Sequence, residues 1–422
     1  MNEPSADVPA AVAEEVRRTP LEALNPAQDA LFASDAMWPI FDRLRDEAPV
    51  HFTADSAYGP FWSITRYQDI MAVESDHQVF SSARGAGLLP LESQAAARAI
   101  ENRHFMEMDP PQHAAQRNTV SPALASANLA KLAPLIRERA GLILDGLPIG
   151  ETFDWVDLVS KELTAMTLAT LFDFPFEERR RLTHWSDMMT NAPGFGPVKS
   201  WDQKRDEIAE CHAVFRELWK ERAAQPQKFD LISMLAHGEA TRNMDVEEYH
   251  GNVGLLIIGG NDTTRNTISG SVYALNRYPA QYAKLRENPA LIASMVSETI
   301  RWQTPLSHMR RTATCDFEFG GKTIRKDDLV VMWYLSGNRD ETVIEDPYNY
   351  IIDRARPRTH LSFGFGIHRC VGNRLAELQL TIIWEEILKR FPVIELAGEP
   401  VRTHSIFVHG YETLPVVIPR RN

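Results

Sequence analysis

The distribution of apolar residues along the chain predicts a mostly helical protein with a few short strands. β-Branched and aromatic residues gather at 50–52 and 61–67, as strands require. From about 124 to 300, apolar residues recur at i, i+3 and i+4, which is typical of helices that face a core. A strand-like composition returns over 311–334, and residues 391–418 favour hairpins. We therefore expect a mainly α architecture with small β-sheets (α+β).

Two predicted helices stand out by their length. The first covers residues 372–389 and carries apolar side chains on one side. The second begins at Asp245, which forms a plausible capping box with Glu248, and continues to Arg277. Its roughly 32 residues would span about 48 Å, enough to cross the whole molecule. The pair Gly259-Gly260 lies in the middle of this helix, where each glycine costs about 1 kcal/mol of helix stability relative to alanine. Glycines kept at such a cost indicate a kink, a tight packing point or a functional site.

Composition and charge narrow the class of protein. The chain has 422 residues, a net charge of −12 and 44% apolar residues, which excludes a largely disordered chain. The acidic balance argues against a nucleic-acid-binding protein, which would carry a basic field. No stretch approaches the roughly 20 apolar residues of a membrane span, and the first 20 residues lack an export signal. We expect a cytoplasmic protein.

The chain shows no internal repeat and no linker that would divide it into separable domains. Residues 1–25 are polar and alanine-rich, and they predict a loosely ordered tail with one short helix at 11–18. Residues 26–422 are expected to form a single catalytic domain.

Cys370 is the cysteine with the most informative surroundings. The three cysteines, Cys211, Cys315 and Cys370, are too few and too scattered for a disulfide framework or a zinc site. Cys370 ends the glycine-rich run FGFGIHRC and precedes the predicted helix at 372–389. Glycines let the backbone approach a large planar group closely, and the N-terminus of a helix favours a thiolate. A thiolate placed there can be an axial ligand of haem iron, whereas an isolated cysteine of this kind would usually be structural.

The pattern Phe-x-x-Gly-x-x-x-Cys-x-Gly at 363–372 resembles the haem-binding loop of the cytochrome P-450 superfamily. The resemblance extends from about residue 37 to residue 418. It implies a single-domain fold with the long central helix over haem b, and it makes Cys370 the iron ligand. It also implies a monooxygenase that inserts one oxygen atom from O2 into a C–H bond.

Other segments match the family in the correct chain order. The run GGNDT resembles its oxygen-activation segment: Gly259 would leave room for dioxygen, Thr263 would hydrogen-bond it or a water, and Asp262 would relay protons. The residues matched to the partners of the haem propionates are His113, Arg117, Arg311 and His368. The residues matched to a structural ion cluster beneath the haem are Glu298, Arg301 and Arg354. Taken singly, the propionate residues could be solvated, and Glu298 with Arg301 could be a surface pair.

Within the family, the stretches WQTPLSHMRRT and WYLSGNRDE look most similar to bacterial terminal hydroxylases of alkanes and fatty acids. Hydroxylation of a terminal methyl requires a narrow apolar channel, because positioning must override the weaker internal C–H bonds. The residues matched to this channel are Leu255, Ile258, Leu306, Ser307 and Phe407, with plain core packing as the alternative. Residues 82–104, expected to form a lid, do not match, so chain length and headgroup stay open. Arg84, Arg98 and Arg103 could meet a polar headgroup.

The resemblance also implies partners, because the chain contains no flavin or iron–sulfur segment. A separate 2Fe–2S ferredoxin, served by an NAD(P)H-dependent ferredoxin reductase, would supply electrons, and Arg369 and Arg374 would help to bind it. Three alternatives remain at this stage. They are terminal hydroxylation of a steroid side chain or branched lipid, a peroxide-using enzyme of the same fold, and a non-catalytic thiolate-haem sensor. Asp262 and Thr263 favour the oxygen-dependent enzyme.

Overall fold

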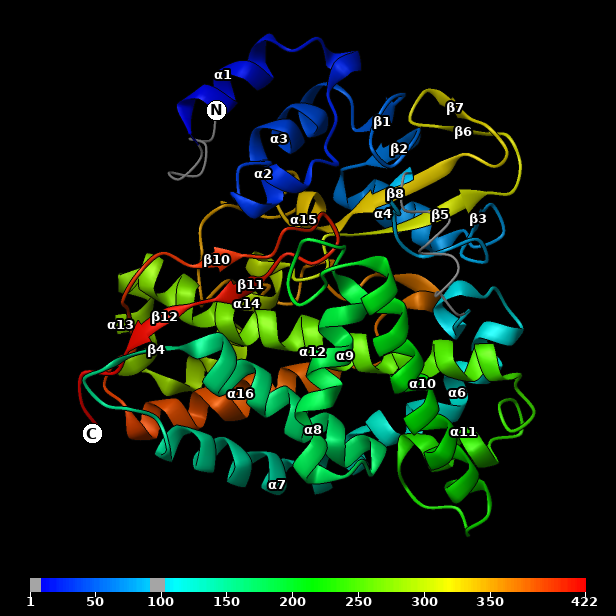
Figure 1. Ribbon diagram of the computed structural model, residues 1–422. Coiled ribbons are helices and arrows are strands. Elements are labelled where there is room, and N and C mark those ends of the chain that lie inside the picture. The colour runs from blue at the N-terminus through cyan, green and yellow to red at the C-terminus, as the bar shows by residue number, and fades with distance from the viewer. Residues whose placement is uncertain (1–8, 92–102) are drawn as a thin grey trace.

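Helix α12 (Val246–Arg277) crosses the middle of the molecule and organises the fold (Figure 1). The computed structural model describes residues 9–91 and 103–422. As predicted, α12 has 32 residues and begins after Asp245, whose carboxylate accepts the Glu248 N–H at 2.7 Å. The capping box also predicts that the Glu248 side chain accepts the Asp245 N–H. This part of the prediction is wrong, because the Glu248 side chain accepts a hydrogen bond from Gln116.

Two buried polar residues of α12 are paired with residues before it in the chain, which helps a long internal helix to tolerate them. Asn261 accepts a hydrogen bond from Thr164 at 2.9 Å, and the hydroxyls of Ser269 and Ser160 lie 2.8 Å apart. These contacts offset the desolvation of the polar groups. The helix is continuous through Gly259-Gly260, so neither glycine ends it.

The remaining long helices pack around α12 in the lower part of Figure 1 and enclose the largest core. They are α6 (Gln112–Val120), α7 (Ser126–Asp145), α8 (Glu162–Phe172), α9 (Arg180–Thr190), α10 (Trp201–Ala223), α11 (Leu231–His237), α13 (Pro279–Glu287), α14 (Ile292–Gln303) and α16 (Asn373–Arg390). Short helical segments connect them: η3 (Phe105–Glu107), η4 (Ser121–Leu124), the π-helical η5 (Val156–Lys161), η6 (Phe176–Glu178), η7 (Pro289–Leu291), α15 (Tyr334–Gly337) and η8 (Gly366–His368).

A five-stranded sheet forms the upper part of the molecule (Figure 1). Its order is β1 (Val50–Thr53), β2 (Phe61–Ile64), β8 (Leu329–Trp333), β5 (His308–Ala313) and β3 (Phe80–Ser81). Strands β2 and β8 run parallel, with Ser63 opposite Val331, and the other neighbours are antiparallel. The smaller sheets join β4 (Thr152–Asp154), β12 (Pro415–Val417) and β9 (Glu395–Leu396), then β10 (Val401–Arg402) and β11 (Tyr411–Thr413), then β6 (Phe317–Phe319) and β7 (Lys322–Ile324). The prediction of a mainly α protein with small sheets is confirmed.

The N-terminal region contains α1 (Ala10–Arg18), η1 (Leu21–Ala23), α2 (Asp29–Ala33), α3 (Trp38–Glu47) and α4 (Tyr67–Ser75). The short helix predicted at 11–18 is present. The described part of the expected tail is packed rather than loose, because Val16 and Leu24 are buried with Ile40 and Leu44 of α3. Arg43 also donates hydrogen bonds to two carbonyls of this segment, at 2.6 and 2.8 Å. The division into a tail and a domain at residue 25 stays a prediction.

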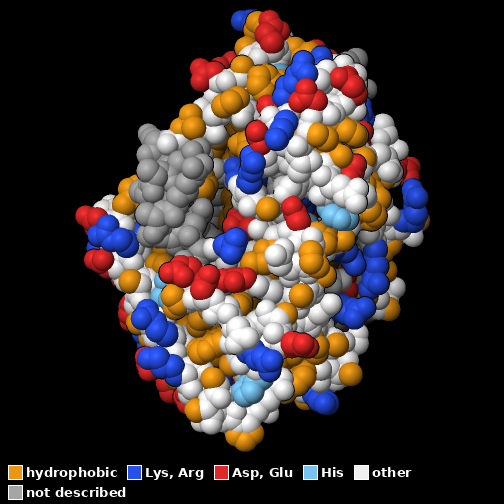
Figure 2. Space-filling view, turned by 90° about the vertical axis from the view of Figure 1, so that its right-hand side faces the viewer, with side chains coloured by type: hydrophobic (Ala, Val, Ile, Leu, Met, Phe, Trp, Pro, Cys, Tyr) orange, Lys and Arg blue, Asp and Glu red, His pale blue; other side chains and the backbone are white. Residues whose placement is uncertain are grey.

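Charges of both signs are interspersed on the face shown in Figure 2. Among the described helices, none is both long enough and apolar enough to cross a membrane.

Candidate active site around Cys370

The loop that ends at Cys370 is shaped by two glycines with positive φ, Gly364 (67°) and Gly366 (65°). Other residues adopt this region only with strain. The Cys370 N–H closes the loop by donating to the Phe363 carbonyl at 2.8 Å. Helix α16 then begins at Asn373. The glycine-rich turn and the helix start therefore fix where the sulfur lies.

Cys370 keeps accessible surface and is not packed in the hydrophobic core, although protein atoms surround its sulfur closely. Its distance from bulk water raises the pKa of the thiol, while the N–H groups of Gly372 and Asn373 and the Arg117 guanidinium lower it. Hydrogen bonds from N–H groups and a nearby cation stabilise a thiolate. The site is thus built to hold a sulfur anion once a metal ion neutralises it.

One face of α12 is left uncovered by the described chain. Between residues 249 and 275 of this helix, the residues that are not buried are Leu255, Ile258, Gly259, Gly260 and Thr263. Residues four apart share a helix face, so Leu255, Gly259 and Thr263 form one stripe. A Cβ placed on Gly259 would meet no described atom within 4 Å. The Thr263 hydroxyl donates to the Gly259 carbonyl at 2.9 Å, and its lone pairs stay available.

Asp262 points away from this stripe and into an ion network. Its carboxylate lies 2.7 Å from Arg265, which also pairs with Asp187 at 2.6 Å. Asp187 lies 3.2 Å from Lys161. Side-chain exposure rises along this chain, from 1% at Asp262 to 24% at Lys161. Burial raises the pKa of Asp262, and the Arg265 charge opposes that shift. The network thus links the buried Asp262 to the more exposed Lys161.

The four predicted propionate residues come from three segments, and the structure gathers His113, Arg117 and His368 closely. The imidazole centroids of His113 and His368 are 4.1 Å apart. Burial, helped by Arg117 and Arg311, lowers the pKa of His113 to about 4. Burial, helped by Arg311 and His113, lowers the pKa of His368 to about 2. Both imidazoles are therefore neutral at pH 7 in this state.

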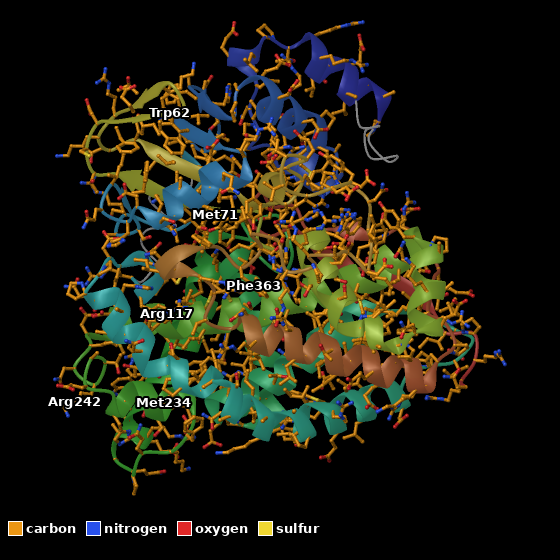
Figure 3. All side chains as sticks on the ribbon, turned by 180° about the vertical axis from the view of Figure 1, so that it is seen from behind. Trp62, Met71, Arg117, Met234, Arg242 and Phe363 are labelled. Atoms are coloured by element: carbon orange, nitrogen blue, oxygen red, sulfur yellow. The ribbon has the colours of Figure 1, made fainter. Side chains whose placement is uncertain are left out.

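Several polar atoms of this group have no hydrogen-bond partner among the described residues, although they are buried. They are His113 Nε2, Arg117 Nη1 and His368 Nδ1. Unpaired buried donors are costly, so such a cluster indicates a site for an anionic group. Arg117 also donates to the Arg369 carbonyl in the cysteine loop; Figure 3 labels Arg117 on α6 and Phe363 in that loop. The donors therefore fit the propionates of the haem that the sequence implies, and Cys370 fits its iron.

The predicted channel residues come together in part. The Ser307 N–H donates to the Phe407 carbonyl at 3.0 Å, and Leu306 bridges Val408. Ser307 is fully buried, whereas Leu306 and Phe407 are partly exposed, as Leu255 and Ile258 are on α12. The Phe407 ring lies 3.3 Å from the position of a Cβ on Gly87.

Two of the three arginines in the predicted lid, Arg84 and Arg103, belong to the described residues. Arg84 is exposed and pairs with Asp327, and Arg103 is exposed. Arg98 lies outside the described residues, as do residues 92–102 of the predicted lid. A role of Arg84 in binding a headgroup is therefore disfavoured, because its charge is already paired at the surface.

The predicted ion cluster is buried rather than superficial. Glu298 accepts two hydrogen bonds from Arg301 at 2.7 Å and two from Arg354 at 2.9 and 3.0 Å. Arg301 also donates to the carbonyls of Asn338, Pro347 and Asn349. Glu298 and Arg301 are at most 1% exposed. The cluster thus fastens α14 to residues 338–354.

Sequence reasoning missed three polar residues near the site. Ser82 shares a hydrogen bond with His368 Nε2 at 3.1 Å, His308 lies behind Phe407, and Glu74 contacts the cysteine loop. A serine, a histidine and a glutamate isolated in the sequence give no spacing signal. Their roles follow only from contacts between segments that are far apart in the chain.

Comparisons with known proteins agree with this geometry. A family model described as cytochrome P450 matches residues 37–409. Linalool 8-monooxygenase of Pseudomonas putida is 35% identical over 92% of this chain and 97% of its own length. A methyl-branched lipid omega-hydroxylase of Mycobacterium tuberculosis is 30% identical over 96% of this chain and 98% of its own. The structure of CYP153D17 from Sphingomonas sp. PAMC 26605 is 44% identical, with a TM-score of 0.86, and covers 93% of this chain and 98% of its own. The chain therefore belongs to the cytochrome P450 family, whose members are haem-containing monooxygenases.

Proposed function

We propose that this enzyme hydroxylates the terminal methyl group of medium- or long-chain alkanes or fatty acids, with haem b bound through Cys370. The observation that carries the proposal is the uncovered stripe of α12. Leu255 lies on this stripe with Thr263, and the partly exposed Ile258 lies next to it on the helix, in a protein whose Cys370 is not packed in the core. The methyl-branched lipid omega-hydroxylase among the relatives supports a terminal position. The apolar wall suits a hydrocarbon chain held end-on.

The reaction consumes R–H, O2, two electrons and two protons, and it yields R–OH and water. Haem supplies the activation of dioxygen when it is bound. Cys370 would hold its iron and donate electron density as a thiolate, and His113, Arg117, Arg311 and His368 would bind its propionates. Thr263 positions a proton donor beside Gly259, where a side chain would block access. Asp262 is the acid of this proton route, and Arg265, Asp187 and Lys161 hold its carboxylate in place.

Electrons come, in this proposal, from a 2Fe–2S ferredoxin reduced by an NAD(P)H-dependent reductase. A hollow of about 580 Å³ opens beside the cysteine loop. Its lining includes Arg358, Arg369, Arg374 and the loop residue Phe363. Three guanidinium groups in an acidic protein make a local site for an acidic partner. The proximity of Phe363 to Cys370 makes this face a short route to the iron.

A spectral titration of the purified ferric protein tests the substrate class. A medium-chain alkane, a fatty acid and a steroid ketone are added separately, and the low-spin to high-spin change in haem absorbance is followed. A shift with a linear chain and none with the steroid is expected. A shift with the steroid alone would replace the proposal with side-chain hydroxylation of a steroid. Absence of a thiolate-type spectrum would refute the role of Cys370.

Thr263→Ala tests the proton route. Because a positioned proton donor contributes roughly 100-fold or more, we expect product formed per NAD(P)H oxidised to fall by about 10-fold or more. Oxygen is then reduced by two electrons and two protons to hydrogen peroxide, which is measured directly. Thr263→Ser, which keeps the hydroxyl, is the matched control and should retain coupling. Equal coupling in both variants would contradict the role of the hydroxyl.

A further inference from the structure

Glu74 is a buried carboxylate near the end of α4 that no step of the proposed reaction uses. It is 3% exposed. Its Oε2 accepts the Phe365 N–H at 2.6 Å, and its Oε1 accepts the Tyr334 hydroxyl at 2.6 Å. Arg311 lies 3.5 Å from Oε1. One side chain thus contacts the cysteine loop, α15 and strand β5.

The cysteine loop approaches Glu74 closely at two of its glycines, Gly364 and Gly366. A Cβ on Gly366 would lie 2.4 Å from the Glu74 carbonyl oxygen. This distance is too short, and a backbone atom cannot move aside as the end of a flexible side chain can. A Cβ on Gly364 would lie 3.3 Å from both Glu74 Oε1 and the Tyr334 hydroxyl. These glycines are therefore needed for the approach of the loop to α4 as well as for its positive φ angles. The loop is built to sit against this carboxylate.

Three neighbours of Glu74 partly offset the cost of burying its charge. Burial raises the pKa of Glu74 to about 7, while Arg311, the Tyr334 hydroxyl and the Phe365 N–H oppose that shift. A buried carboxylate without such partners would be strongly destabilising. Arg311 is also expected to bind a propionate. Glu74 consequently connects the propionate side of the site with the loop of the sulfur ligand.

We propose that Glu74 is a positioning residue of the haem site, which fastens the Cys370 loop through Phe365 and Tyr334 and holds Arg311 through its charge. The inference rests on the proposed binding of haem by Cys370 and Arg311. Outer partners of metal ligands commonly contribute about 10–100-fold to affinity or activity. Glu74 therefore acts on haem retention and on the iron's reduction potential, rather than on the substrate.

The test compares holoenzyme variants by three readouts: the absorbance maximum of the ferrous–CO complex, the rate of haem transfer to apomyoglobin and the reduction potential. Glu74→Gln keeps an acceptor for Phe365 but removes the charge. We expect it to keep the 450 nm band and to raise the potential at pH 8, because a nearby anion disfavours adding an electron. Tyr334→Phe and Glu74→Ala loosen the loop, and haem transfer should accelerate about 10-fold.

Glu22→Gln is the matched control, since it removes the same charge at an exposed position of η1. The proposal for Glu74 is overturned by two results together. They are a folded Glu74→Gln with the same reduction potential as Glu22→Gln, and a Tyr334→Phe that loses haem no faster than the wild type. Failure of Glu74→Ala to fold would leave this comparison unaffected, because it uses Glu74→Gln and Tyr334→Phe. Should the wild-type protein itself lack the 450 nm band, the assignment of Cys370 fails first, and the two failures are distinguishable.

Discussion

His308 shows how one uncharged side chain can join three parts of the site. It is fully buried, and its Nδ1 lies 3.1 Å from the Ile406 carbonyl while its Nε2 lies 3.4 Å from the Leu88 N–H. These partners assign the proton to Nδ1, which donates, and leave Nε2 as the acceptor. The ring also packs against Trp333 and Phe407. The described part of the predicted lid at Leu88, strand β5 and the C-terminal loop are thus tied by a neutral imidazole.

This arrangement predicts a pH effect on stability. Burial, assisted by Arg310, lowers the pKa of His308 to about 3. In the unfolded chain this histidine takes up a proton near pH 6.5, whereas in the folded protein it stays neutral. The free energy of unfolding therefore falls as the pH drops below 6.5, by about 1.4 kcal/mol per pH unit down to about pH 3. Thermal unfolding of the wild type and His308→Gln at pH 7.5 and 5.5 checks it. The wild type should lose about 1.4 kcal/mol more than the variant between the two pH values. Parallel losses would contradict the assignment of a neutral His308.

At the scale of elements, the ion cluster on α14 fastens that helix to a long segment without secondary structure. Glu298 also accepts the Ile351 N–H at 2.8 Å, so its carboxylate holds the backbone three residues before Arg354 as well as the Arg354 side chain. Such an internal carboxylate satisfies backbone groups that a strand or helix would otherwise satisfy. The irregular segment before the cysteine loop is thereby fixed in space.

Glu298→Gln should therefore destabilise the protein strongly. Removing one partner of a buried ion pair leaves the other uncompensated and costs about 3–5 kcal/mol. Chemical unfolding and the fraction of protein that incorporates haem measure the effect. Asp202→Asn breaks an exposed i, i+3 pair with Arg205 on α10 and is the matched control, expected to cost less than about 1 kcal/mol. Similar losses in the two variants would show that the cluster is not a structural tie.

The sequence could predict those elements whose signals are local. The bounds of α12 follow from the Asp245 cap and from the proline after Tyr278, and Glu298 with Arg301 follows from helix spacing. The π-helical turn at Val156–Lys161 and the two-residue strand β3 have no such signal, because packing and pairing with distant segments create them. The cysteine loop has a local signal and is predicted from the sequence. Glu74, which contacts that loop from a distant segment, has none.

At the scale of the whole molecule, two loops from distant parts of the chain meet. Phe195, between α9 and α10, is flanked by Gly194 and Gly196 with positive φ, and its ring stacks on His404 with centroids 3.9 Å apart. His404 belongs to the same loop as Phe407. The contact joins the α9–α10 connection to the loop that carries a predicted channel residue.

Phe195→Ala should accelerate exchange of substrate. An aromatic pair contributes about 0.5–1.5 kcal/mol, so its loss should favour separation of the two loops by about 2- to 10-fold. Stopped-flow measurement of the haem spin-state change gives the binding and release rates. Phe229→Ala, at a ring that is 60% exposed, is the control and should leave both rates unchanged. Unaltered rates in Phe195→Ala would mean that substrate enters elsewhere.

The parallel pairing of β2 with β8 has a consequence for biosynthesis. Ser63 pairs with Val331, so 268 positions separate two neighbouring strands of one sheet. A ribosome that adds about 5–20 residues per second needs on the order of 10–50 s to produce the second strand after the first. During that time the β1–β2 hairpin has a free edge and an apolar face, which are open to aggregation. We therefore expect the nascent chain to depend on a holdase chaperone until residue 333 has left the exit tunnel.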